Sequence, residues 1–120
     1  MCQVLVVDDN EDIRETMRDF LEEEGYHVVT AKNGADALSR LEQLEAGKLP
    51  CLMLVDLLMP VMDGVELIRR LRESARFAPV PVIAISAAST VDPPPGTRLL
   101  PKPVGPTVIL EEVRNACGAP

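Results

Sequence analysis

The chain has 120 residues, a length that predicts one domain, residues 1–120, built around one core. Its formal net charge of −7 argues against direct binding of nucleic acid, which requires a surplus of Lys and Arg facing phosphate. No uninterrupted apolar stretch approaches the length of about 18 residues that spans a membrane, and no signal peptide is recognisable. We therefore expect a cytoplasmic protein without membrane contact.

The chain contains three widely spaced cysteines, Cys2, Cys51 and Cys117. Their spacing matches no Cys or Cys/His pattern of a zinc site. We expect reduced thiols, as in most cytosolic proteins, with Cys51 opening an apolar strand.

Short apolar runs alternate with amphipathic segments. The apolar runs predict strands at about 3–8, 27–30, 51–56, 82–86 and 98–100. The amphipathic segments predict helices at about 11–24, between Asn33-Gly34 and Gly47, at about 64–74 and at about 106–117. Strands separated by helices imply an α/β protein with a parallel sheet and right-handed crossovers.

The connection between the fourth and fifth strands, residues 87–97, is different. It contains Asp92-Pro93-Pro94-Pro95-Gly96, and consecutive prolines remove backbone donors and clash with a helix. We expect at most one helical turn at 87–91, followed by an extended loop.

Acidic residues end two of the apolar runs. Asp8 and Asp9 follow the first strand, and Asp56 closes the third. The carboxyl ends of strands in an open parallel sheet are where ligands bind, so these carboxylates are expected to share one crevice. Two such charges about 4 Å apart repel by roughly 4 kcal/mol at an effective dielectric of 20, and a divalent cation offsets that repulsion. Ligands that are all oxygen favour Mg²⁺ or Mn²⁺.

Asp56, Lys102 and Ser86 complete a site for phosphoryl transfer. A carboxylate beside bound Mg²⁺ can attack a phosphoryl group in line and form an aspartyl phosphate. Lys102, between two prolines after the fifth strand, would place a positive charge on the phosphoryl oxygens, and Ser86 would donate a hydroxyl hydrogen bond. Asp63 is instead expected to cap the helix that begins at Gly64.

These residues together resemble the receiver domain of two-component response regulators. The residues that carry the resemblance are Asp8-Asp9, Asp56 with Met59-Pro60 and Asp63-Gly64, Ser86 and Lys102-Pro103. The resemblance covers essentially the whole chain and rests on the joint order and spacing of these motifs.

The resemblance implies a flavodoxin-like sheet of five parallel strands in the order 2-1-3-4-5, with the fourth crossover helix shortened or absent. It implies that Asp56 accepts phosphate from a phosphohistidine on a sensor histidine kinase or histidine phosphotransfer protein. Asp9 and Asp56 would contact Mg²⁺ directly, Asp8 through water, and the backbone carbonyl of Leu58 would be a further ligand. Such a domain is a switch and not a conventional turnover enzyme.

The sequence departs from the family pattern in two places. Leu99 occupies the position three residues before the lysine where an aromatic residue is common, so the usual aromatic switch is not expected. The short fourth crossover removes much of the usual output and dimer face, so dimerisation through that face is not expected either.

Three other functions compete with this interpretation. A metal-dependent phosphatase also uses an aspartate nucleophile, but it usually carries an acid at the position of Leu58. A flavin or nucleotide carrier would need a glycine-rich loop where Asp8 and Asp9 lie. A degenerate receiver that binds its partner without phosphorylation is disfavoured by the intact acids, although the shortened crossover keeps it open.

Overall fold

The computed structural model describes the chain except residues 1–2, 46, 58, 60–61, 88–91 and 120. The strands are β1 (Gln3–Val7), β2 (His27–Ala31), β3 (Leu52–Asp56), β4 (Val82–Ser86) and β5 (Arg98–Pro101). The helices are α1 (Glu11–Glu23), α2 (Gly34–Glu42), α3 (Gly64–Glu73) and α4 (Pro106–Cys117). The second helix ends at Glu42, well before the predicted stop at Gly47, and the other predicted bounds differ from these by at most one residue.

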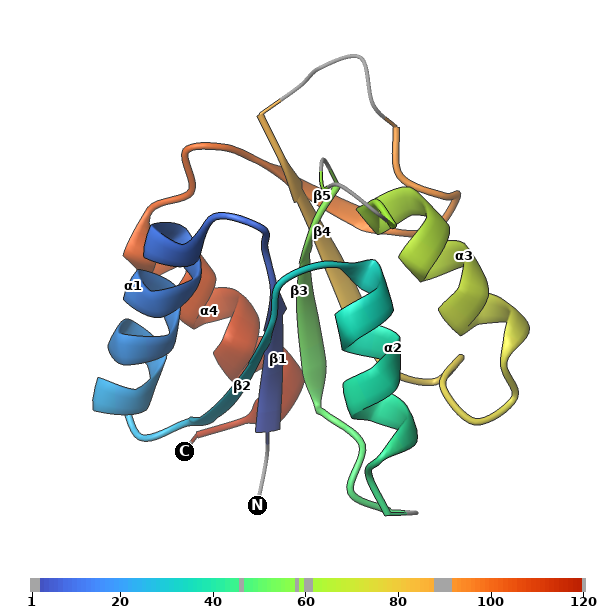
Figure 1. The fold of residues 1–120 in the computed structure, drawn as a ribbon. Helices are drawn as coiled ribbons and strands as arrows, with labels where there is room; N and C mark the ends of the chain where they lie inside the picture. The colour runs from blue at the N-terminus through green and yellow to red at the C-terminus, as the bar shows by residue number, and fades with distance from the viewer. Residues whose placement is uncertain (1–2, 46, 58, 60–61, 88–91, 120) are drawn as a thin grey trace.

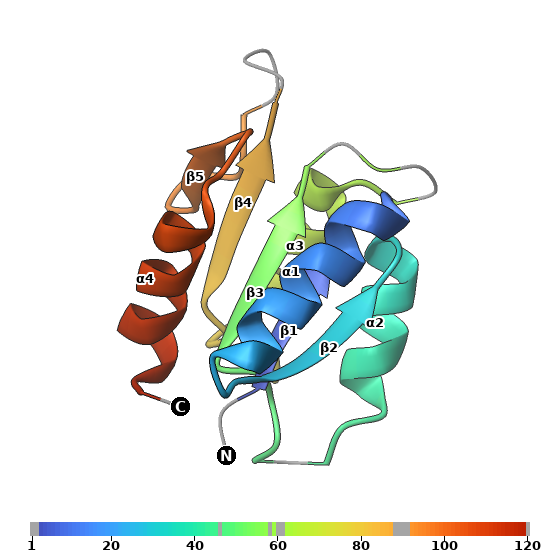
Figure 2. The same ribbon diagram turned by 90° about the vertical axis from the view of Figure 1, so that its left-hand side faces the viewer.

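The five strands form one parallel sheet in the order β2-β1-β3-β4-β5, as the resemblance implied. In Figure 2, which looks onto one face of the sheet, the arrows of β2, β3 and β4 point the same way. The central strand β3 is buried along its whole length, whereas the edge strands β2 and β5 are partly exposed. The apolar run Leu52–Val55 of β3 is typical of a strand that is covered on both faces.

Helices cover both faces of the sheet, with α1 and α4 on one face and α2 and α3 on the other (Figure 1). The first pair buries Leu21, Ile109 and Val113 against the sheet. The second pair buries Leu41 and Ile68. The sheet therefore separates the core into two apolar layers and leaves its carboxyl-terminal edge free for polar side chains.

Backbone hydrogen bonds continue beyond the carboxyl ends of the strands. The amide of Asp8 donates to the carbonyl of Ala31 at 3.1 Å, and the amide of Leu57 donates to Ile85 at 3.0 Å. The amide of Lys102 donates to the carbonyl of Ser86, also at 3.0 Å. The residues just after β1, β3 and β5 are thus fixed by the same ladders that align the strands.

The connection between β4 and β5 has no helix in its described part, residues 87 and 92–97. Its Pro94–Thr97 end forms a turn, and the Arg72 guanidinium on α3 donates to the Thr97 hydroxyl at 3.1 Å. Leu99 on the following strand is 39% exposed. The expected shortened crossover is confirmed there, while the single turn expected at 87–91 falls largely outside the described residues.

The expectation of three reduced thiols is wrong for Cys51, which is disulfide-bonded. Cys117 is a free thiol, and burial raises its pKa. Spacing excluded a zinc pattern, but it does not report whether a thiol is oxidised, because that depends on which cysteine the fold brings near. Within the described residues, no helix is both long and apolar enough to cross a membrane.

Replacing Ile68 with Ala should lower the free energy of unfolding by about 2–4 kcal/mol, because a fully buried side chain leaves a cavity under the sheet. Val108→Ala, at a position that is 41% exposed, is the matched control and should change it by no more than about 0.5 kcal/mol. Urea unfolding followed by circular dichroism measures both. Equal losses would contradict the assigned core.

Candidate functional site

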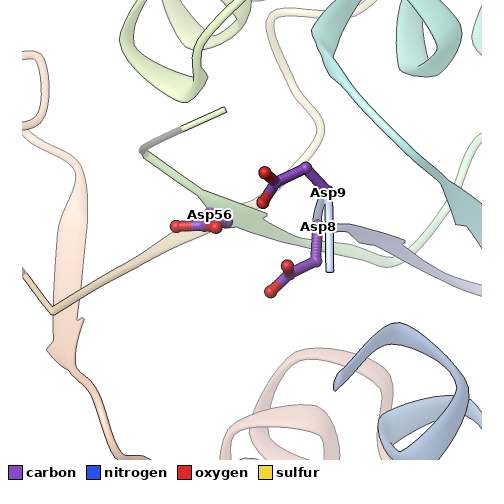
Figure 3. Close-up of side chains that lie close together, drawn as sticks. All are labelled: Asp8, Asp9 and Asp56. Carbon is purple, nitrogen blue, oxygen red and sulfur yellow. The ribbon is translucent and has the colours of Figure 1, made fainter. Parts of the chain in front are cut away.

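Three carboxylates converge at the carboxyl ends of β1 and β3. Asp8, Asp9 and Asp56 each offer one oxygen, and these oxygens lie within 4.8 Å of one another. Figure 3 shows the three side chains directed to the same side of the strand ends. Asp8 and Asp56 are buried, with 4% and 6% of their surface exposed, while Asp9 is exposed. The sequence predicted this convergence from the apolar runs that precede the acids.

Lys102 lies between the two buried carboxylates. Its Nζ is 3.3 Å from Asp8 Oδ2 and 3.4 Å from Asp56 Oδ2. The lysine follows β5, and the peptide bond that joins it to Pro103 is cis. The ammonium group offsets part of the repulsion between carboxylates that are otherwise held close together.

The pKa of Lys102 reflects two opposing effects. Burial lowers it, but the charges of Asp8 and Asp56, together with hydrogen bonds to both, outweigh burial and raise the pKa above its ordinary value of 10.5. The side chain therefore stays protonated throughout the physiological range. A permanent positive charge next to Asp56 is what stabilisation of phosphoryl oxygens requires.

Ser86 ends β4 and is buried. The register of the sheet pairs it with Pro101, and its carbonyl accepts the amide of Lys102. Serine and lysine are therefore joined through the backbone at the same edge of the sheet as Asp56.

Two residues support Asp8 that the sequence did not single out. The Arg14 guanidinium on α1 donates to the backbone carbonyl of Asp8 at 2.9 Å. The backbone N–H of Asn10 donates to Asp8 Oδ1, also at 2.9 Å. Asn10 also caps α1 by accepting the Ile13 amide. The only signal in the sequence was an arginine close to the start of the helix that follows the acidic pair.

The remaining predicted residues fall into two groups. Asp63 caps α3, as expected, because its carboxylate accepts the Glu66 amide at 2.9 Å. Leu58, whose carbonyl was expected to bind the metal, lies outside the described residues. The roles of Asp8, Asp9, Asp56, Ser86 and Lys102 in binding and transfer stay predictions.

An apolar groove begins beside this cluster. It has a volume of about 430 Å³. It is lined by Ile13 and Met17 of α1, Ile85 and Ala87 at the end of β4, and Lys102, Pro103 and Val104. Lys102 therefore belongs both to the charged cluster and to the lining of the groove.

Lys102→Met should lower the free energy of unfolding near pH 7 by about 1–3 kcal/mol, because two buried carboxylates lose their cation. The loss is below that of a fully buried pair because the lysine side chain is 22% exposed. A raised folded pKa means that the contribution is complete below about pH 10 and disappears as pH rises through that pKa.

Urea unfolding from about pH 7 to about pH 11 tests this, with Lys32→Met, at an exposed position before α2, as the matched control. The control should match wild type within about 0.5 kcal/mol. A difference between wild type and Lys102→Met that persists undiminished at the alkaline end would contradict the assignment.

The chain is similar in sequence and structure to known receiver proteins. It is 33% identical to the response regulator receiver protein CpdR of Brucella abortus, over 96% of each chain. It is 35% identical to response regulator Rre1 of Synechocystis sp., but spans only half of that protein. The receiver domain of a signal transduction histidine kinase from Syntrophus aciditrophicus aligns with a TM-score of 0.84 at 28% identity, over 97% of this chain and 89% of that one.

Response regulator TrrA of Thermotoga maritima, solved in complex with Mg²⁺ and a beryllium fluoride, aligns with a TM-score of 0.82 at 28% identity, over 97% of this chain and 99% of that one. The sequence model of the response regulator receiver domain family matches residues 4–94, which include all three clustered acids and Ser86. Lys102, β5 and α4 lie beyond that match, after the shortened crossover. The chain belongs to the response regulator receiver domain family, whose members are signalling domains and not conventional enzymes.

Proposed function

We propose that the chain is a phosphoacceptor switch in which Asp56 takes a phosphoryl group from a phosphohistidine, with Mg²⁺ bound nearby. The observation that carries this proposal is the joint position of three carboxylate oxygens within 4.8 Å and a lysine Nζ 3.4 Å from Asp56. A bare carboxylate cluster would be unfavourable, and a cation together with a phosphoryl group gives each charge a partner.

In the proposed transfer, one Asp56 oxygen bonds to phosphorus while the phosphorus–nitrogen bond to the donor histidine breaks. Lys102 then exchanges its contact with Asp56 for the new phosphoryl oxygens. Ser86 donates its hydroxyl to one of those oxygens. Asp56 thus acts as the nucleophile, and the other two residues stabilise the product.

The donor set fits Mg²⁺ or Mn²⁺, since all of its candidate atoms are oxygens. Asp9 and Asp56 would hold the ion directly, Asp8 through water, and the Leu58 carbonyl would complete the protein ligands. When bound, the ion neutralises charge on the phosphoryl oxygens. Arg14 and Asn10 keep Asp8 in place for this role.

The proposed donor is a sensor histidine kinase or a histidine phosphotransfer protein. Two features support a protein donor. The apolar groove beside Lys102 offers contact area next to the nucleophile. The acids Glu11 and Asp12 in the first turn of α1 would attract a basic partner.

Incubating the protein with acetyl phosphate and Mg²⁺ should add one phosphoryl group, detected by intact-protein mass spectrometry. Asp56→Asn should abolish the addition, because an amide is not a nucleophile for phosphorus. Asp63→Asn is the matched control, since asparagine caps a helix equally well, and should be phosphorylated like wild type. An unmodified wild type would instead favour a degenerate receiver.

The phosphorylated state should decay slowly, with a half-life of minutes or longer. Family members place the hydrolytic water with polar groups two residues after the phosphoacceptor and two after the serine, and here these positions are Leu58 and Ala88. Timing the loss of the phosphoryl group from the purified domain after removal of acetyl phosphate checks this. Decay within seconds would refute the expectation.

A further inference from the structure

We propose that Gly34 and Gly64 are positioning residues, which set the places of Met62 and Leu57 beside the end of β3 and thereby the geometry of phosphoryl transfer at Asp56. The proposal rests on the proposed function of Asp56. It comes from a steric requirement at two glycines that lie outside the charged cluster and contact the two ends of the loop after β3.

Gly64 contacts the beginning of the loop. Its amide donates to the Leu57 carbonyl at 3.0 Å, which brings the start of α3 onto the end of β3. A Cβ on Gly64 would overlap the Asp56 carbonyl oxygen and would lie 2.7 Å from Leu57 Cα. Both neighbours are backbone atoms that cannot rotate away, so any side chain would move α3 relative to the phosphoacceptor.

Gly34 contacts the end of the same loop from a different element. Its amide donates to the Met62 carbonyl at 3.0 Å. A Cβ on Gly34 would lie 2.7 Å from Met62 Cγ and 2.8 Å from Met62 O. Neither Gly34 nor Gly64 has a positive φ, so the need for glycine is one of space and not of backbone conformation.

Local hydrogen bonds make the start of α2 stiff, and the packing of Ala37 limits how far it can move away from an added methyl group. The Asn33 side chain accepts the Asp36 amide at 2.8 Å, and the Asp36 carboxylate accepts the Lys32 amide at 3.0 Å. Ala37, one turn further along, has no exposed surface and packs against the sheet. The displacement caused by Gly34→Ala would therefore fall on Met62 and, through the adjoining Asp63 and Gly64, on the backbone at Leu57 and Asp56.

A positioning role and a purely structural role of Gly34 and Gly64 predict different measurements. A structural role would lower stability and leave the chemistry of the folded protein unchanged. A positioning role changes phosphorylation and metal binding in protein that is still fully folded, because a misplacement of about 1 Å can cost up to about a hundredfold in rate.

The test compares wild type, Gly34→Ala, Gly64→Ala and the control Gly105→Ala, at a temperature where circular dichroism shows each to be folded. Gly105 precedes α4 with a negative φ, and a Cβ there would have no neighbour within 4 Å. Initial rates with acetyl phosphate come from mass spectrometry, and Mg²⁺ affinity comes from isothermal titration calorimetry.

We expect Gly34→Ala to slow phosphorylation about tenfold and to weaken Mg²⁺ binding severalfold, with Gly105→Ala within about twofold of wild type on both measures. Gly34→Ala carries the test even if Gly64→Ala does not fold. A folded Gly34→Ala protein with the rate and Mg²⁺ affinity of wild type would overturn the positioning role while leaving the proposed function intact. A wild type that takes up no phosphate and binds no Mg²⁺ would overturn both.

Discussion

The attraction between the Lys102 ammonium and two buried carboxylates is the interaction on which the rest of the site depends. Without a cation, Asp8 and Asp56 would meet at the edge of the sheet with too little water to separate their charges. The lysine makes that proximity tolerable before any ion is bound. The site is therefore formed in advance, and a divalent ion and a phosphoryl group would rearrange charges that are already in place.

The scaffold places these charges through its strands and not through flexible loops. Parallel strands end at one edge of the sheet, and the hydrogen-bond ladders continue to Asp8, Leu57 and Lys102. Two apolar layers, one on each face, hold the strands in register. Asp8, Asp56 and Ser86 lie at or directly after the ends of strands that are almost entirely buried, and the backbone of Lys102 is held to β4 by its hydrogen bond to Ser86.

The sequence predicts most of the fold and the charged centre, because both follow from local patterns. An apolar run that ends in a carboxylate places Asp56 without knowledge of any other element. The contacts of Arg14, and the steric fit of Gly34 against Met62, depend on how separate elements meet. The disulfide state of Cys51 depends on proximity in the same way. Periodicity and spacing carry no information on contacts between separate elements, so these contacts can be identified only from the structure.

The crossover between β4 and β5 has a consequence for how such a domain could change state. No helix covers the outer side of β5 within the described residues, and Leu99 there is open to water. The ladder with β4 and the buried side chain of Leu100 hold β5 in place, so it is the outward-facing side chain of Leu99 that can move without disturbing the core. Because Leu99 is already open to water, its movement would exchange little apolar area with solvent, and a change of state that involved it would depend mainly on the charges around Lys102.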